Sequence, residues 1–168
     1  STEFKNKIIL RKKILKFDPD YIIISTFTSN HYNQLLFLNN ILKNKKILVE
    51  KPLYDLKIKY KLFKFNNEIY VGYNLRFDPI IIYLKKLLNN KKILSYNAIC
   101  NSFLPNWRKS NYELSSSAQK KYGGGVVSDL SHEIDYTFYL LGDLKLLFNY
   151  SSKISKLKIN TNDYFILN

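Results

Sequence analysis

Short apolar runs alternate with longer amphipathic stretches over the first half of the chain. The runs cover residues 21–24, 46–49 and 69–71, and the amphipathic stretches cover residues 3–16, 31–43 and 55–65. Brief β-branched runs of this kind are typical of strands buried on both faces of a parallel sheet. Apolar positions at helical spacing among lysines and asparagines indicate helices that pack on such a sheet. The alternation with short links predicts parallel βαβ units with right-handed crossovers, and hence an α/β fold.

The pattern changes after about residue 75, and a domain boundary is predicted near residues 73–78. Asp78-Pro79 opens a predicted helix through Leu88, with the proline in the first turn. Residues 93–103 read as a longer strand, residues 104–122 as a long polar segment, and residues 145–154 and 163–167 as strands. After the polar segment, a glycine run at 123–125 precedes a predicted helix through Leu141. Such a long polar segment in a compact domain is usually functional or mobile.

Composition excludes several classes of protein. The chain of 168 residues is 46% hydrophobic and 15% aromatic, so it can bury a core of its own. The single cysteine, Cys100, excludes an internal disulfide framework and a multi-cysteine zinc site, and no metal site is predicted. No apolar stretch approaches the roughly 18 residues of a membrane span, and no signal peptide is visible. We therefore expect a cytoplasmic protein without a membrane partner.

The two ends of the sequence suggest an incomplete chain. There is no methionine, Ser1 leads directly into a predicted helix, and Asn168 follows a strand-like run. We expect the sequence to be part of a longer protein, cut at both ends.

The formal net charge of +14 raises the question of an anionic partner. Almost all of the positive charge is lysine, with Arg11, Arg76 and Arg108 as the only arginines. The lysines are spread along the chain, which favours solvated helix faces over a nucleic-acid surface. A dinucleotide or a nucleotide sugar would also benefit from such a field, so an anion-attracting surface stays open as an alternative.

Polar residues follow each of the three predicted parallel strands. They are Ser25-Thr26, Glu50-Lys51 and Gly72-Tyr73-Asn74. Since parallel strands end at one edge of the sheet, and ligands bind outside the carboxyl ends, these residues predict a ligand site. Pro52 ends the second strand and turns the chain beside Lys51. The simpler alternative is a strand terminator with a surface ion pair.

A second candidate is the glycine run followed by Asp129 and His132. Glycines allow close approach of a ligand or of the backbone, and the helix that follows them offers an anion-binding amino end. The spacing of three predicts Asp129 and His132 on one helix face, where a carboxylate fixes the tautomer of an imidazole and makes it a general base. The alternative is a first-turn aspartate and a core or capping histidine.

The loop from Thr26 to His31 is a third candidate. Hydroxyls and amides at a helix start can hold phosphate or ribose groups. Ordinary helix capping, with Thr28 or Ser29 as the N-cap, is the alternative.

In series, these motifs resemble the Gfo/Idh/MocA family of NAD(P)-dependent oxidoreductases, the relatives of glucose-fructose oxidoreductase and inositol dehydrogenase. The motifs are Thr26 with His31, Glu50-Lys51-Pro52, the Gly72-Tyr73-Asn74-x-Arg76-Phe77-x-Pro79 run, and Gly123-Gly124-Gly125-x-x-x-Asp129. The resemblance runs from about residue 18 to residue 145. The stretch around Trp107-Arg108 and Tyr112 is similar to a subgroup associated with surface-polysaccharide sugar synthesis.

The resemblance implies a fold and an activity. Residues 1–75 would be the carboxyl-terminal part of a Rossmann, doubly wound dinucleotide-binding domain. Residues 76–168 would be part of an α+β substrate domain with an open, mainly antiparallel sheet that also forms a homo-oligomer. The cofactor would be NAD or NADP, and the substrate a sugar or sugar nucleotide that exchanges a hydride at a hydroxyl or carbonyl carbon.

The resemblance also implies roles for single residues. The cofactor would be lined by Ser25, Thr26, His31, Glu50, Lys51, Asn74, Trp107 and Arg108. The catalytic residues would be Lys51, Asp129 and His132, and the substrate would contact Lys51, Tyr112, Asp129 and His132. The Lys51–Pro52 bond is often cis in such proteins.

The sequence departs from the family pattern at three points. Phe27 stands where the family has proline, and His132 follows Asp129 by three positions rather than four. No G-x-G-x-x-G occurs among the five glycines, so we expect this chain alone to bind cofactor poorly and to be inactive. A basic nucleic-acid-binding module and a non-catalytic relative are the alternative functions.

Overall fold

The computed structural model describes residues 2–55 and 64–168. The chain divides into two compact units, Ser1–Gly72 and Tyr73–Asn168. Most of the helix predicted at residues 55–65 lies outside the described residues.

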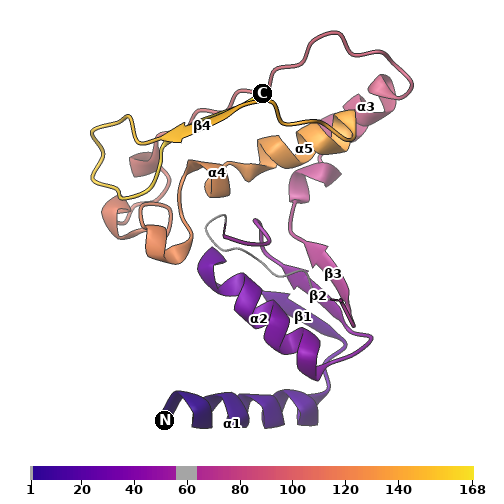
Figure 1. The fold of residues 1–168 in the computed structure, drawn as a ribbon, viewed down its shortest axis with the longest axis vertical. Helices are drawn as coiled ribbons and strands as arrows, with labels where there is room; N and C mark the ends of the chain where they lie inside the picture. The colour runs from indigo at the N-terminus through magenta and orange to yellow at the C-terminus, as the bar shows by residue number, and fades with distance from the viewer. Residues whose placement is uncertain (1, 56–63) are drawn as a thin grey trace. The chain divides into compact units, whose positions relative to one another are not determined.

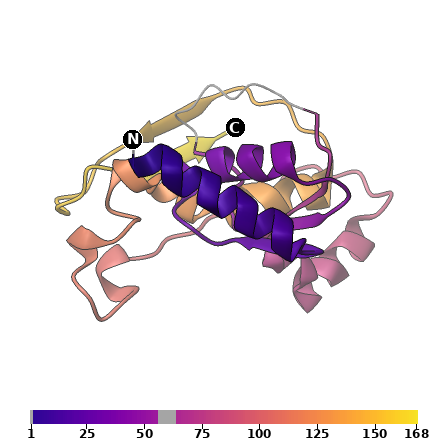
Figure 2. The same cartoon turned by 90° about the horizontal axis from the view of Figure 1, so that it is seen from below.

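The first unit is a parallel sheet with helices. Its elements are α1 (Thr2–Phe17), β1 (Tyr21–Ile24), α2 (Thr28–Ile41), β2 (Lys46–Val49) and β3 (Glu68–Val71). The 3-stranded sheet has the order β1-β2-β3, and both pairings are parallel. Figure 2 shows α1 along its whole length, and Figure 1 shows α2 lying along the sheet. The predicted strands and their parallel pairing are confirmed.

The core of this unit lies between α2 and one face of the sheet. Its buried side chains are Ile24, Leu35, Leu38, Leu42, Ile47 and Val49. The other face is more open, because Tyr21, Ile23 and Tyr70 are 73%, 66% and 50% exposed. The prediction of strands buried on both faces is therefore wrong for β1, since alternate side chains of a strand point away from the helix that covers it.

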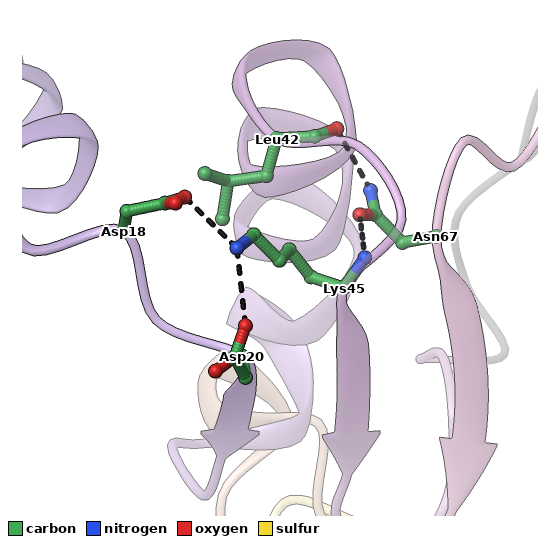
Figure 3. A network of polar contacts seen from close by, with 5 residues as sticks. All are labelled: Asp18, Asp20, Leu42, Lys45 and Asn67. Carbon is green, nitrogen blue, oxygen red and sulfur yellow. Dashed lines mark hydrogen bonds and ion pairs between the residues drawn. The ribbon is translucent and has the colours of Figure 1, made fainter.

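Two asparagines hold the amino ends of the strands to α2. Asn67, just before β3, donates to Asn39 Oδ1 at 3.2 Å. It also donates to the Leu42 carbonyl at 3.0 Å (Figure 3). Its own Oδ1 accepts the Lys45 backbone N–H at 3.0 Å. Asn39 in turn accepts the Asn66 N–H at 2.8 Å. This buried amide network satisfies the backbone groups where α2 ends and β2 and β3 begin.

Lys45 adds an ion-pair cluster at the same edge. Its Nζ lies 2.9 Å from Asp18 Oδ1 and 3.3 Å from Asp20 Oδ1, and its side chain is 13% exposed (Figure 3). The hydrogen bond that Lys45 donates to the Asp18 carboxylate raises the pKa of Lys45 above its ordinary value. The cluster ties the α1–β1 connection to the start of β2.

The second unit contains short helices and a hairpin. Its helical elements are η1 (Asn74–Phe77), α3 (Pro79–Leu88), η2 (Leu104–Asn106), η3 (Tyr112–Leu114), η4 (Lys120–Tyr122), α4 (Val126–Asp129) and α5 (Ser131–Leu141). Strands β4 (Asn149–Ser152) and β5 (Tyr164–Leu167) pair antiparallel. With a parallel sheet in the first unit and an antiparallel pair of strands in the second, the chain has the predicted mixed α/β architecture.

Three predictions for this unit are corrected. Residues 93–103 form no strand, because a strand-like composition does not by itself provide a partner strand to pair with. The hairpin strand β4 is shorter than the predicted 145–154. The helix after the glycine run is interrupted at Leu130, whose φ and ψ of −101° and 31° separate α4 from α5.

The start of α3 follows the prediction. The Asp78 side chain accepts the Ile80 N–H at 2.8 Å, and Pro79 occupies the first turn. Just before it, Arg76 forms two hydrogen bonds to Asp135 of α5, at 2.6 and 2.7 Å. The Arg76 guanidinium carbon lies 5.3 Å from the centroid of the Tyr139 ring. The hydrogen bond that Arg76 donates to the Asp135 carboxylate raises the pKa of Arg76. This bidentate pair fixes η1 on α5.

Among the helices of residues 2–55 and 64–168, none is long and apolar enough to cross a membrane.

Candidate functional site

The three parallel strands end together at one edge of their sheet. The hydrogen-bond ladder continues one residue past the strands, with Glu50 N–H donating to Ile24 O at 2.9 Å and Gly72 N–H to Val49 O at 2.8 Å. We call the residues at this edge the strand-end site; they are Ser25, Thr26, Glu50, Lys51 and Gly72. The ladder therefore brings together the polar residues that the sequence predicts at this edge.

Gly72 lies beside the Glu50 carboxylate. A Cβ at position 72 would lie 3.4 Å from Glu50 Oε2 and 3.5 Å from Val49 O. Glu50 is exposed, and Lys51 next to it is half-buried. The backbone at Gly72 therefore carries no side chain and has an exposed carboxylate alongside.

Thr26 and Lys51 lie in the turns that follow β1 and β2. The Thr26 hydroxyl donates to Gln34 Oε1 of α2 at 2.8 Å, so this hydroxyl already has a partner inside the unit. The Lys51–Pro52 peptide bond is cis, as the resemblance implied.

His31 lies beneath the strand-end site rather than within its open part. It is 1% exposed, with Nδ1 2.9 Å from the Pro52 carbonyl and Nε2 3.2 Å from the Thr26 carbonyl. The predicted capping of α2 by Thr28 or Ser29 is wrong. The helix starts at Thr28 with Phe27 as the N-cap residue, and no side chain caps it.

In the second unit, Asp129 is held by its neighbours. Its Oδ1 accepts the Ser117 hydroxyl at 3.0 Å, and its Oδ2 accepts the Gly125 N–H at 3.3 Å. Ser117 is buried, and its carbonyl accepts the hydroxyl of buried Thr161 at 3.0 Å. The connection between β4 and β5 thereby braces the carboxylate and fixes its direction.

Asp129 borders a hollow of about 60 Å³. Trp107 and Ser117 also line this space, which we call the Asp129 hollow. The Trp107 indole N–H donates to Ser102 Oγ at 2.5 Å, which orients the ring. A volume of this size fits a hydroxyl or a carboxyl substituent together with water.

The remaining predicted site residues of this unit lie elsewhere. The His132 ring meets Tyr73 edge to face at 5.7 Å, and burial raises the pKa of the Tyr73 hydroxyl. The Tyr112 hydroxyl accepts the Lys158 N–H at 3.2 Å. Asn74 begins η1, and Arg108 is exposed after η2. The structure thus groups Asp129 with Trp107, and the interruption at Leu130 removes the single helix that was to place His132 beside Asp129.

The glycine run lets other backbone segments of the same chain pack closely against it. Gly123 and Gly125 have positive φ of 79° and 124°. A Cβ at Gly124 would lie 2.0 Å from Ser116 O and 2.8 Å from Ser117 Cα. The close approach predicted at these glycines is therefore made by residues 116–117.

A larger cavity of about 560 Å³ lies among residues 96–101, α5 and β5. None of the predicted site residues lines it. Burial, and then the proximity of Glu133, raise the pKa of the Cys100 thiol at its border. A raised pKa lowers the thiolate fraction of this exposed thiol and so makes it a weaker nucleophile.

Sequence reasoning missed the residues that support the site. Ser117 and Thr161 hold Asp129, and Gln34 holds Thr26. All three are common polar residues outside any motif, so their positions could be found only from the structure. Within the described part of the chain, no group of three or more His, Cys, Asp or Glu side chains is arranged to hold a metal ion.

Comparison with known proteins gives likeness in structure alone. The sequence matches no protein-family model, and no curated protein matches it. A solved structure of the WlbA (WbpB) dehydrogenase from Thermus thermophilus, in complex with NAD and alpha-ketoglutarate, is similar with a TM-score of 0.59 and 16% identity. That match covers 95% of this chain and 54% of the other.

A second structure of the same enzyme, in complex with NAD and UDP-GlcNAcA, has a TM-score of 0.54 and 18% identity. It covers 86% of this chain and 49% of the other, so the chain spans about half the length of the structures it matches. These similarities establish a dehydrogenase-like fold.

Proposed function

We propose that this chain supplies the nicotinamide side and part of the substrate side of an NAD(P)-dependent oxidoreductase acting on a sugar or sugar nucleotide. The observation that carries the proposal is the strand-end site, where Glu50 lies beside the side-chain-free Gly72 and Lys51 follows Glu50 in the turn after β2. Open α/β sheets bind their ligands at this edge. The similar solved structures, which hold NAD, support the same assignment.

The residues of the strand-end site fit a nicotinamide riboside. Glu50 would accept hydrogen bonds from ribose hydroxyls, and the open backbone at Gly72 would lie against the ring. When bound, the cofactor would accept or return a hydride at the substrate carbon. Lys51 would hold the substrate hydroxyl and help move its proton.

On the substrate side, Asp129 is the better placed of the two proposed proton acceptors. Its carboxylate borders the Asp129 hollow and is aimed by Ser117 and Gly125. His132, which lies against Tyr73, would contribute to the substrate contacts that we propose for it and for Tyr112. Fixing the carboxylate before substrate arrives avoids reorganisation during the reaction.

We further propose a sugar nucleotide as substrate, in surface-polysaccharide sugar synthesis. The similar enzyme solved with UDP-GlcNAcA supports this class. Homo-oligomerisation through the β4–β5 sheet is part of the same proposal, and it is supported by exposed apolar residues along that region. They include Leu146, Leu147, Phe148 and Leu167, with 57%, 77%, 52% and 41% exposure.

The experiment uses the two halves of the cofactor as separate ligands. Because the chain has no G-x-G-x-x-G turn for the pyrophosphate, it should recognise the nicotinamide half. In two-dimensional NMR titrations, nicotinamide mononucleotide should shift the amide signals of Ser25, Glu50 and Gly72, and AMP should shift them little.

A matched pair of lysine variants provides the control. Lys51→Ala should abolish the nicotinamide mononucleotide shifts, whereas Lys43→Ala, an exposed lysine after α2, should leave them unchanged. Shifts produced by AMP alone, or shifts confined to residues 44–46 and 66–67, would contradict the proposal. Salt-sensitive retention on RNA or DNA with no response to either nucleotide would favour the nucleic-acid-binding alternative.

A further inference from the structure

One buried side chain of the first unit joins the turns after β1 and β2. His31 approaches the Thr26 carbonyl with one ring nitrogen and the Pro52 carbonyl with the other. These carbonyls belong to residues directly beside Ser25 and Lys51. The imidazole therefore spans the two polar segments of the strand-end site.

Its partners leave His31 no way to bind a ligand from its present position. A carbonyl oxygen only accepts hydrogen bonds, so a ring nitrogen can bond to either carbonyl only by donating an N–H to it. Both ring nitrogens face backbone oxygens, and the residue is 1% exposed. A cofactor contact would require the ring to leave both carbonyls.

A second contact joins the same segments. The Tyr32 ring, next along α2, meets the Tyr54 ring edge to face with centroids 5.4 Å apart. Burial, and then the proximity of Tyr32, raise the pKa of Tyr54. The first turn of α2 therefore holds the segment after Lys51 at two points, the Pro52 carbonyl and the Tyr54 ring.

We propose that His31 is a positioning residue, which sets the place of Lys51 through the Pro52 carbonyl and does not itself contact the cofactor. The backbone of Lys51 is fixed on one side by the β2 ladder and on the other by this carbonyl. Loss of the imidazole would remove only the constraint at the Pro52 carbonyl and would leave the β2 ladder intact. The consequence for cofactor binding rests on the proposed function, but the effect on the two turns does not.

Hydrogen exchange of the whole chain without nucleotide tests the effect on the turns. His31→Ala should raise amide exchange about tenfold in peptides covering residues 25–30 and 51–55, as expected for the loss of one or two hydrogen bonds. Peptides covering the Asn39–Asn67 network should exchange as in the wild type. Asn33→Ala, an exposed position on the same helix, is the control for a change in α2 and should leave both turns unchanged.

A second variant keeps the test decisive if His31→Ala unfolds the unit. In His31→Gln, the side-chain amide can donate to one carbonyl while its oxygen repels the other, so one turn should loosen and one should stay protected. Faster exchange throughout the unit in both variants, or unchanged exchange in both turns, would overturn the proposal.

The chemical reactivity of the Lys51 amine distinguishes the two possible roles of His31. It should change if His31 positions Lys51, and it should stay the same if His31 only stabilises the fold. In competitive acylation followed by mass spectrometry, His31→Ala should change the rate at Lys51 several-fold and leave Lys43 unchanged. Added imidazole should restore the wild-type rate at Lys51 by refilling the vacated space. An unaltered Lys51 rate in a folded His31→Ala protein would refute the assignment. If nicotinamide mononucleotide fails to bind while these effects are present, the proposed function fails and the positioning role stands.

Discussion

The two ends of the parallel sheet use their polar residues differently. At the amino ends, Asn39, Asn67 and Lys45 bind backbone groups and carboxylates of the chain itself. At the carboxyl ends, the side chains of Ser25 and Glu50 make no hydrogen bond or ion pair within the described residues and are exposed. Polar groups that stabilise the fold are thus separated by the length of a strand from polar groups left available to a ligand.

This difference separates two kinds of mutation. Changes at the amino ends should lower the free energy of unfolding of the first unit and leave ligand recognition intact. Changes at the strand-end site should weaken ligand recognition and leave the free energy of unfolding nearly unchanged. The following substitutions test this separation, in order of decreasing effect on stability.

The largest loss is expected for Asn67→Ala. It leaves the Leu42 carbonyl and the Lys45 N–H without their partner, and unsatisfied buried groups of this kind cost about 1–3 kcal/mol each. We expect the free energy of unfolding to fall by roughly 2–4 kcal/mol. The measurement is urea denaturation followed by the NMR signals of β2.

Asn40→Ala, an exposed neighbour on α2, is the control and should change stability little. Nicotinamide mononucleotide should still shift the Gly72 signal in Asn67→Ala while the unit is folded. An Asn67→Ala protein as stable as the wild type would show that the amide network is not what secures this edge.

A smaller loss is expected when the Lys45 cluster is removed, and it should depend on pH. Because the folded protein raises the pKa of Lys45 above its ordinary 10.5, the contribution is complete below that pH and disappears as the pH rises through the raised value. Asp18→Asn should therefore be less stable than wild type at about pH 8, and the difference should shrink above about pH 10.5. Parallel denaturation curves of the two proteins, taken across this range, measure the difference directly.

A difference between the two proteins that stays constant up to strongly alkaline pH would contradict this account. Tyrosine side chains ordinarily ionise in the same range, but both proteins contain the same tyrosines, so this contribution cancels in the difference.

The smallest effect on stability is expected for Glu50→Gln. The side chain is exposed and packs against nothing that the change would disturb, so the free energy of unfolding should stay within about 0.5 kcal/mol. Binding of nicotinamide mononucleotide should nevertheless weaken, because an amide is a poorer acceptor for ribose hydroxyls than a carboxylate. A titration that shows unchanged affinity would remove Glu50 from the proposed cofactor contacts.

The sequence predicted the parallel sheet well because its signals are local. Three short β-branched runs and the helical spacing between them determine which residues form strands, and their polar ends follow from the chain direction. The start of a helix at Asp78-Pro79 is likewise predicted correctly, because the preference of proline for the first helical turn is a local signal.

The incorrect predictions concern segments whose structure depends on partners far away in the sequence. Residues 93–103 have the composition of a strand, but no partner pairs with them in the described structure. Spacing put Asp129 and His132 on one helix, whereas the hydrogen bonds of Asp129 to Ser117 and Gly125 accompany an interruption of the helix at Leu130. Neither outcome could be predicted from neighbours in sequence. A strand needs a pairing partner from elsewhere in the chain, and Asp129 is held by Ser117, 12 positions away, which is held in turn by Thr161.

Gly124 has a consequence for which sequence changes the protein can accept. The place where its side chain would grow is filled by the Ser116 carbonyl, so even alanine would push residues 116–117 away. The same residues carry the Ser117 hydroxyl that aims Asp129. In a library with every amino acid at position 124, selection for folding and selection for activity should therefore retain the same single residue. Position 50 would instead separate the two selections, since many side chains there would allow folding and few would allow function.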